Sequence, residues 1–303
     1  PPYSYQEKPA FQYDWQSFRN ELIMEWADWL TSQAETLAPK LPLLAALPDT
    51  VFEEDEAQYG VAHEQLAQAM DWNGVVTSVT PSHATYALEY PDQSVQYAFL
   101  RSLAPSKPVV DVEHGILTGE TSPVDSWSAY VHAVVWDAAM SGLDASALPI
   151  PPDGVEVATV FTEPACLMGY AQACMDLNRL APIVAAFQRQ PADVAILWSR
   201  PSKIFNDGVP YLSSTKDAYD GCSFSGYKVR FITERQFTRR ELAETKVLVV
   251  PETPSLHEDT FKTLQEYVFQ GGAVVRIGTP IPYNERGYSR HDSIGTSGLT
   301  VHV

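Results

Sequence analysis

Hydrophobic and polar positions along the first half of the chain repeat with two periods. Stretches in which apolar residues recur every three or four positions predict amphipathic helices, and short apolar runs between them predict strands. Four helices are predicted: one that begins near Asp14, one at 55–70, one at 94–103 and one that begins near Trp127. The predicted strands are 41–47, 74–79, 108–115 and 144–150. Helices that alternate with apolar strands predict a parallel α/β structure.

The first predicted helix shows the pattern most clearly. Asp14 is a suitable N-cap residue, and the apolar positions that follow it at helical spacing are Phe18, Leu22, Trp26, Trp29 and Leu30. The four β/α units amount to half of an eightfold barrel, and a half barrel leaves two strand edges open. We therefore expect either that the other half lies outside this chain or that two chains complete each other.

The second half of the chain repeats the alternation after a long predicted helix at 156–189. Apolar runs predict four more strands, and amphipathic stretches predict two more helices. The predicted strands are 194–198, 229–232, 246–251 and 273–277, and the helices are 211–224 and 257–270. Gly226 and Gly271-Gly272 follow the two helices, as is typical of helix C-termini.

Composition and charge narrow the classes of function. A length of 303 residues favours two domains, and a formal net charge of −18 makes nucleic acid an unfavourable partner. No apolar run approaches the roughly 18 residues that a membrane span needs, so we expect no membrane partner. Cys166, Cys174 and Cys222 are interpreted as reduced, which favours a cytoplasmic protein, with secretion as the alternative.

One short segment carries the candidate chemistry. In Asp111-Val-Glu-His-Gly115 a predicted strand ends in polar residues, and in α/β barrels function lies at the carboxyl ends of the strands. Retaining glycosidases use two carboxylates about 5 Å apart, one as nucleophile and one as acid/base. Glu113, at the end of the strand, is a candidate for one of them; a salt-bridged surface residue is the alternative. Asp111 lies deeper and favours a structural role.

The order of these parts resembles a known family. The run Lys107-Pro-Val-Val-Asp-Val-Glu-His-Gly115, a helix and Gly142-Leu-Asp-Ala-Ser-Ala147 resemble strands seven and eight of clan A glycoside hydrolases. Val247-Leu-Val-Val-Pro251 and Glu266-Tyr-Val-Phe-Gln-Gly-Gly-Ala-Val-Val275 resemble the trimerisation domain of family 42 β-galactosidases. The resemblance implies a partial (β/α)8 TIM barrel, strands five to eight, at 1–155. A connecting helix at 156–190 and a flavodoxin-like α/β domain at 191–303 would follow it. It also implies that Glu113 is the catalytic nucleophile.

Two features depart from the family pattern. The clan's acid/base Glu follows an Asn at the end of strand four, but the acid ahead of the first helix, Glu7, follows Gln6. The resemblance therefore implies an acid/base Glu upstream of residue 1. Strand eight of the clan often ends in a Trp under the sugar, whereas this chain reads Leu148-Pro-Ile-Pro-Pro152.

Three further residues are candidate substrate contacts: His83, His114 and Glu120. The alternatives are a solvated loop residue for His83, a packing residue for His114 and an exposed acid for Glu120. The sequence lacks G-x-G-x-x-G and P-loop motifs, and the expected reaction needs neither a metal nor an organic cofactor. The resemblance implies a retaining glycosidase acting on β-linked galactosides or related sugars. It would form a homo-oligomer (trimer or dimer) or pair with a chain supplying the first half barrel. The alternative is a non-catalytic fragment or pseudoenzyme that binds carbohydrate or assembles with a partner.

Overall fold

The computed structural model describes residues 8–47, 51–52, 60–79, 92–116, 126–150, 160–205, 210–278, 280–290 and 300–302. These residues form an α/β structure in which the described strands pair in parallel. They divide into two compact units. One comprises the described residues of Pro42–Asp49 and Met70–Gln190, and the other those of Pro1–Leu41, Thr50–Ala69 and Pro191–Val303.

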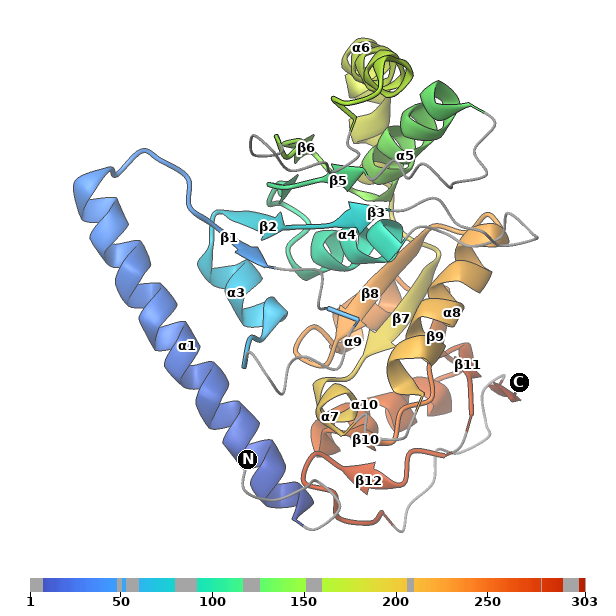
Figure 1. Ribbon diagram of the computed structural model, residues 1–303. Helices are drawn as coiled ribbons and strands as arrows, with labels where there is room; N and C mark the ends of the chain where they lie inside the picture. The colour runs from blue at the N-terminus through green and yellow to red at the C-terminus, as the bar shows by residue number, and fades with distance from the viewer. Residues whose placement is uncertain are drawn as a thin grey trace. The chain divides into compact units, whose positions relative to one another are not determined.

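The first unit is built on a four-stranded parallel sheet (Figure 1). In the order in which they pair, its strands are β1 (Leu44–Leu47), β2 (Trp72–Val75), β4 (Val109–Asp111) and β6 (Ala145–Ser146). Leu47 is paired with Val75, Val75 with Asp111, and Asp111 with Ser146. The carboxyl ends of all four strands therefore lie at one edge of the sheet. Beyond that edge, β3 (Ser78–Val79) pairs with β5 (Gly115–Ile116).

Three helices accompany this sheet: α4 (Asp92–Leu103), α5 (Trp127–Ser141) and α6 (Pro164–Gln188). The predicted helices at 94–103 and from Trp127 are confirmed, and the long one begins at Pro164, with 151–159 outside the described residues. Apolar side chains from β3, β5, α5 and α6 form one core, among them Val79, Ile116, Val131, Cys166 and Ala173. Burial of this apolar area is the main stabilising contribution to the unit.

The second unit contains a five-stranded parallel sheet. Its strands, in pairing order, are β13 (Thr300–His302), β11 (Val274–Arg276), β9 (Val247–Val250), β7 (Val194–Trp198) and β8 (Val229–Thr233). A short parallel pair joins β10 (Ser255–Leu256) to β12 (Tyr283–Asn284). The helices of this unit are α1 (Pro9–Leu37), α3 (His63–Ala69), α7 (Arg200–Ile204), α8 (Tyr211–Phe224), α9 (Arg239–Ala243) and α10 (Glu258–Phe269). All five buried residues of β7 are apolar, as expected for a central parallel strand.

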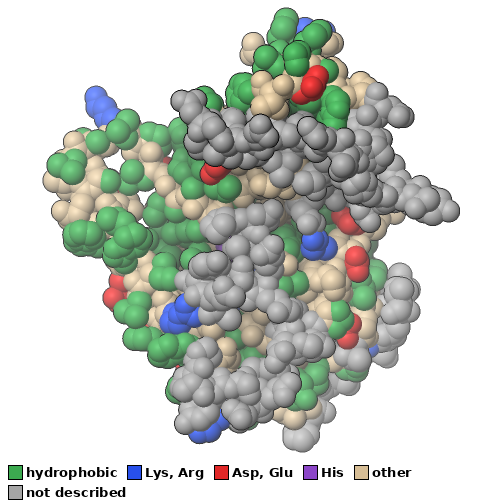
Figure 2. All heavy atoms as spheres, in the orientation of Figure 1, with side chains coloured by type: hydrophobic (Ala, Val, Ile, Leu, Met, Phe, Trp, Pro, Cys, Tyr) green, Lys and Arg blue, Asp and Glu red, His purple; other side chains and the backbone are tan. Residues whose placement is uncertain are grey.

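Helix α1 confirms the prediction of a helix, but it begins at Pro9, so Asp14 lies within it and is not the N-cap. The face that it buries also differs from the predicted one. Its buried residues are Gln12, Gln16, Asn20 and Ala27, whereas the predicted apolar stripe is exposed, with Trp26 at 61% and Trp29 at 58%. Apolar side chains are correspondingly visible along the place of α1 in the space-filling view (Figure 2). The 3.6-residue period thus identified the helix without identifying its inner face.

Several predicted strands are shorter in the structure. The run 74–79 divides into the end of β2 and β3, and the run 108–115 divides into β4 and the start of β5, with a turn around Glu113. The predicted strand 144–150 is reduced to Ala145–Ser146, because Pro149 has no N–H to extend a ladder. No helix in the described part of the chain is both long and apolar enough to cross a membrane.

Candidate active site at the carboxyl edge of the four-stranded sheet

Glu113 lies two residues beyond the carboxyl end of β4, and its side chain is exposed. The N–H groups around it are all held. Val112 donates to the carbonyl of Val75 at 2.9 Å, and His114 donates to that of Ala147 at 2.8 Å. Gly115 donates to the carbonyl of Thr77, which lies between β2 and β3, at 2.8 Å. An exposed carboxylate is therefore presented on a well-anchored segment of backbone, where parallel α/β proteins commonly bind ligands.

The N–H of Glu113 itself is held by a side chain. It donates to Asp111 Oδ1 at 3.1 Å, while Asp111 Oδ2 accepts hydrogen bonds from Thr77 Oγ1 and from Tyr97 OH, both at 2.6 Å. Asp111, Thr77 and Tyr97 are completely buried. Since a buried carboxylate is costly unless it is hydrogen-bonded, the three donors explain how the interior tolerates Asp111. The structural role predicted for Asp111 fits these contacts.

His114 is turned away from solvent, unlike its neighbour Glu113. The residue is 1% exposed, and its Nε2 lies 2.9 Å from Gln93 Oε1. Because an amide oxygen only accepts, Nε2 carries the hydrogen and the neutral ring leaves Nδ1 as an acceptor. Within the described residues Nδ1 is buried without a hydrogen-bond partner. Burial lowers the pKa of His114, against a smaller opposing effect of Asp111, so the ring is neutral at neutral pH.

Gln93 extends the polar contacts to α5. Its Nε2 donates to the carbonyl of Val134 at 3.1 Å and to Asp137 Oδ2 at 3.2 Å. Ser94 donates to the same oxygen of Asp137. Burial raises the pKa of Asp137, although the hydrogen bonds from Ser94 and Gln93 oppose the rise. The position of His114 is thus tied to both α4 and α5.

The four sequence candidates are distributed unevenly in the structure. Glu113 and His114 are adjacent at the carboxyl edge, one exposed and one buried. His83 and Glu120 lie outside the described residues. Thr77, Gln93 and Tyr97 were not predicted, because no local pattern marks side chains that meet Asp111 or His114 from 14 to 34 residues away.

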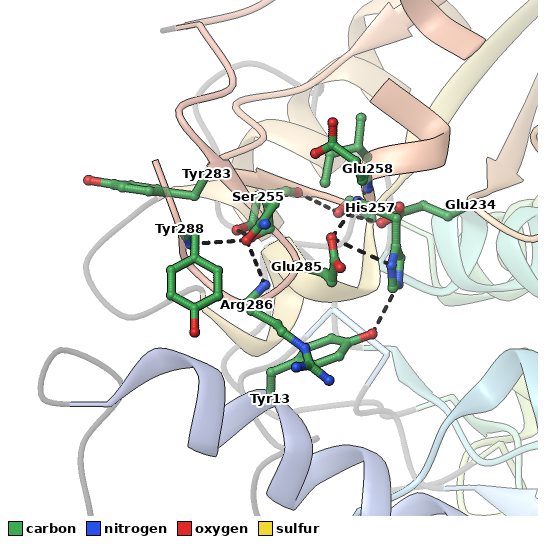
Figure 3. A network of polar contacts seen from close by, with 12 residues as sticks. Tyr13, Glu234, Ser255, His257, Glu258, Tyr283, Glu285, Arg286 and Tyr288 are labelled. Atoms are coloured by element: carbon green, nitrogen blue, oxygen red, sulfur yellow. Dashed lines mark hydrogen bonds and ion pairs between the residues drawn. The ribbon is translucent and has the colours of Figure 1, made fainter. Parts of the chain in front are cut away.

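A second polar cluster lies at the carboxyl edge of the five-stranded sheet (Figure 3). Glu234 accepts hydrogen bonds from Ser199 Oγ and from the N–H of His257, each at 2.8 Å. Tyr13 OH lies 3.0 Å from His257 Nε2. Burial raises the pKa of Glu234 to about 7. These contacts connect α1 with the loops that follow β7, β8 and β10. We therefore interpret the cluster as one that holds these elements together, not as a second catalytic site. Among the described residues, no group of three or more His, Cys, Asp or Glu side chains could hold a metal ion.

Comparisons with known proteins agree with this arrangement. No family model matches the sequence, and the search of curated proteins found no match. A GH42 exo-carrageenase from Bacteroides ovatus superposes with a TM-score of 0.81 at 19% identity, over 97% of this chain and 42% of that one. A β-galactosidase from Bacillus circulans gives a TM-score of 0.71 at 15% identity, over 91% and 41%. An exo-β-1,4-mannosidase from an Opitutaceae bacterium gives 0.61 at 13% identity, over 89% and 52%.

The chain has the fold of the corresponding part of these enzymes. The agreement extends over nearly all of this chain, but the chain spans less than half the length of the exo-carrageenase and of the β-galactosidase. The family resemblance read from the sequence is therefore confirmed at the level of fold, and the chain resembles a portion of such enzymes.

Proposed function

We propose that this chain is the nucleophile-bearing part of a retaining glycoside hydrolase that acts on β-linked galactosides or related sugars. The observation that carries the proposal is the exposed carboxylate of Glu113, anchored just beyond the carboxyl end of β4. Support comes from the structural neighbours, which are glycosidases. The four-stranded unit then corresponds to strands five to eight of a (β/α)8 barrel.

The same proposal assigns the remaining parts of the chain. The five-stranded unit is assigned to a flavodoxin-like domain, and its strand order β13-β11-β9-β7-β8 supports this assignment. The acid/base Glu is supplied from upstream of residue 1, either by a longer polypeptide or by a second chain that completes the barrel. A homo-oligomer, trimer or dimer, fits a domain of the trimerisation type. Domain limits of 1–155, 156–190 and 191–303 belong to this assignment.

In the proposed reaction, a carboxylate oxygen of Glu113 attacks the anomeric carbon of the sugar. The bond from that carbon to the leaving oxygen breaks, and the leaving group takes the electron pair and a proton from the acid/base Glu. Water activated by the same acid/base residue then displaces Glu113, so that the anomeric configuration is retained. The chain supplies the nucleophile, and the other carboxylate protonates the leaving group in the first step and activates water in the second.

This division of labour permits a test on the chain alone. The probe is 2,4-dinitrophenyl 2-deoxy-2-fluoro-β-galactoside, whose leaving group departs without protonation and whose fluorine slows both steps by opposing positive charge at the anomeric carbon. The first step then needs only the nucleophile, and the glycosyl-enzyme accumulates. We expect intact mass spectrometry to show one added fluorogalactosyl group, located on Glu113 by peptide mapping.

The matched control is Glu113→Gln, which keeps the shape of the side chain and removes the nucleophile. We expect this variant to gain no mass while its circular dichroism spectrum and melting temperature match those of the wild type. The alternative function is a non-catalytic carbohydrate-binding fragment, which the span of 42% of the exo-carrageenase favours. Binding of the probe without any covalent product in the wild type would establish that alternative.

A further inference from the structure

We propose that Asp111 is a positioning residue for Glu113, and that Thr77 and Tyr97 hold Asp111 in place. The inference rests on the proposed function of Glu113 and extends it to the three buried residues Asp111, Thr77 and Tyr97. Asp111 acts through the backbone of Glu113 and has no contact with the sugar. Its effect is to fix the position from which the nucleophile attacks.

The hydrogen-bond pattern around Glu113 singles out Asp111. The neighbouring N–H groups of Val112 and His114 donate to backbone carbonyls of adjacent strands or loops. The N–H of Glu113 donates to a side chain instead, Asp111 Oδ1. β4 ends at Asp111, and the N–H of Val112 still donates to Val75 of β2. At Glu113 the Asp111 carboxylate accepts the N–H, where a backbone carbonyl of a neighbouring strand would accept it in a continuing ladder. The attachment of Glu113's own peptide group therefore depends on where that carboxylate is held.

The carboxylate is held from the opposite side by two hydroxyl groups. Thr77 follows β2 and Tyr97 projects from α4, and both donate to Asp111 Oδ2 at 2.6 Å. The two hydroxyl oxygens lie 2.9 Å apart, so each restricts the other. One oxygen of Asp111 thus faces the scaffold and the other faces the segment that carries Glu113. This arrangement transmits the positions of β2 and α4 to the nucleophile.

Position matters because a reacting carboxylate must lie within about 3–3.5 Å of the carbon that it attacks, and a displacement of about 1 Å can lower a rate about 100-fold. Loss of Asp111 frees the N–H of Glu113 and leaves two buried hydroxyl groups without their acceptor. The expected consequence is a slower attack by Glu113 with little change in the affinity for the sugar.

The chain offers a matched control at the opposite end of the same strand. Asp144 Oδ2 accepts the N–H of Val109, the first residue of β4, at 2.8 Å, and Asp144 also pairs with Arg101. Asp144 and Asp111 therefore both hold an N–H group in or beside β4 with a carboxylate. Only Asp111 does so at the end that carries Glu113. Asp144→Ala should destabilise the strand without changing the rate at which Glu113 is labelled.

The experiment measures the rate of labelling by the dinitrophenyl fluorogalactoside over a range of probe concentrations, together with the melting temperature. For Asp111→Ala we expect the maximal labelling rate to fall about 100-fold, with the half-saturating concentration unchanged. Asp111→Asn should recover part of the rate, because its amide oxygen still accepts the N–H of Glu113. Tyr97→Phe, which removes one of the two supporting donors, should fall between the wild type and Asp111→Ala.

The outcomes separate this inference from the proposed function. If the wild type is never labelled, the proposed function fails. If the wild type is labelled and folded Asp111→Asn and Tyr97→Phe react at the wild-type rate, Asp111 is structural only and the inference is overturned. Equal losses of rate in Asp144→Ala and in the Asp111 variants would also overturn it, because the effect would then follow general stability. Should Asp111→Ala fail to fold, the two conservative variants still decide the question.

Discussion

At the scale of single residues, the chain accommodates two buried carboxylates in related ways. Asp111 receives two hydroxyl groups and one backbone N–H. Glu234 receives Ser199 Oγ, the N–H of His257 and a hydrogen bond from Thr260. The contacts described for both carboxylates are hydrogen bonds from uncharged donors. Breaking such a set leaves other buried polar groups unsatisfied, at a cost of about 1–3 kcal/mol for each group.

Glu234 gives a prediction for the dependence of stability on pH. Burial raises its pKa from an ordinary value of 4.5 to about 7, so the folded chain binds the proton more tightly than the unfolded chain. The resulting stabilisation is complete below about pH 4.5 and is lost as the pH rises toward about 7. In Glu234→Gln this loss is absent. We therefore expect the free energy of unfolding of the variant to rise relative to that of the wild type as the pH increases from about 5 to about 8, a range that covers the raised pKa of Glu234. The measurement is urea unfolding at each pH.

An exposed carboxyl group provides the control for this titration. Glu244 follows α9 and is exposed, so Glu244→Gln makes the same substitution without disturbing a buried group and serves as the comparison for Glu234→Gln. If Glu234→Gln and the wild type keep a constant difference in unfolding free energy across this range, Glu234 is not the titrating group.

The sequence predicts those site residues that a nearby pattern marks, and it does not predict those that reach the site from distant segments. Glu113 and His114 are marked by their position at the end of a predicted strand, and the alternation of side chains along a strand predicts that they point to opposite sides. The structure gives them opposite burial, although both residues lie in the connection after β4 and not in a strand. Asp111 shares the parity of Glu113, yet it is buried while Glu113 is exposed, because the strand ends between them. Tyr97 and Gln93 reach the site across the fold, and no periodicity reveals such contacts.

At the scale of elements, the hydrophobic period of α1 predicts a helix correctly but does not predict which face of that helix is buried. The apolar stripe of α1 is exposed, and the polar side chains of Gln12, Gln16 and Asn20 are buried instead. A periodic pattern states that two faces differ; which face is covered depends on what lies beside the helix. Exposed apolar stripes of this kind commonly mark a surface that another segment covers.

The contact between α5 and α6 gives a prediction at this scale. A Cβ atom added at Gly169 of α6 would lie 2.2 Å from the backbone oxygen of Ser128, closer than atoms can approach. We expect Gly169→Ala to force the two helices apart and to lower the unfolding free energy by about 1–3 kcal/mol or more. The measurement is equilibrium unfolding in urea.

A glycine in another helix serves as the matched comparison. Gly221 lies within α8, and a Cβ added there would meet nothing within 4 Å. Gly221→Ala should therefore stabilise the chain by about 0.5–1 kcal/mol, through the higher helix propensity of alanine. A neutral Gly169→Ala would mean that α5 and α6 are not packed as closely as the structure describes.

Strand lengths were predicted less well than strand order. The run at 74–79 contains the end of β2 and the whole of β3, and the run at 108–115 contains the whole of β4 and the first residue of β5. Their division into β2 with β3, and β4 with β5, arises because consecutive segments pair at two levels of the carboxyl edge. Hydropathy does not register a change of pairing partner, so each of these two runs predicts a single strand.

At the scale of the whole molecule, the chain combines a large negative charge with open sheet edges. The formal net charge is −18. Among the described strands of the four-stranded sheet, β1 and β6 each pair on one side only. Unpaired N–H and C=O groups at a sheet edge favour association with another chain, whereas a high net charge opposes it through repulsion. The balance between these effects depends on ionic strength.

This balance predicts association that depends on salt. Raising the ionic strength from about 0.01 M to about 1 M shortens the Debye length from about 30 Å to about 3 Å. Repulsion between chains of like charge is then largely screened, while pairing at the strand edge is little affected. We expect sedimentation velocity to show a single 33.6 kDa chain at low salt and larger species at high salt.

Two substitutions distinguish the strand edge from the helix as the contact surface. Ala46→Lys, which places a charge on the edge strand β1, should reduce the larger species because edge lysines disfavour strand pairing. Trp26→Ser, on the exposed stripe of α1, serves as the comparison. If Trp26→Ser removes the larger species and Ala46→Lys does not, association proceeds through the helix and the strand edge is not the contact.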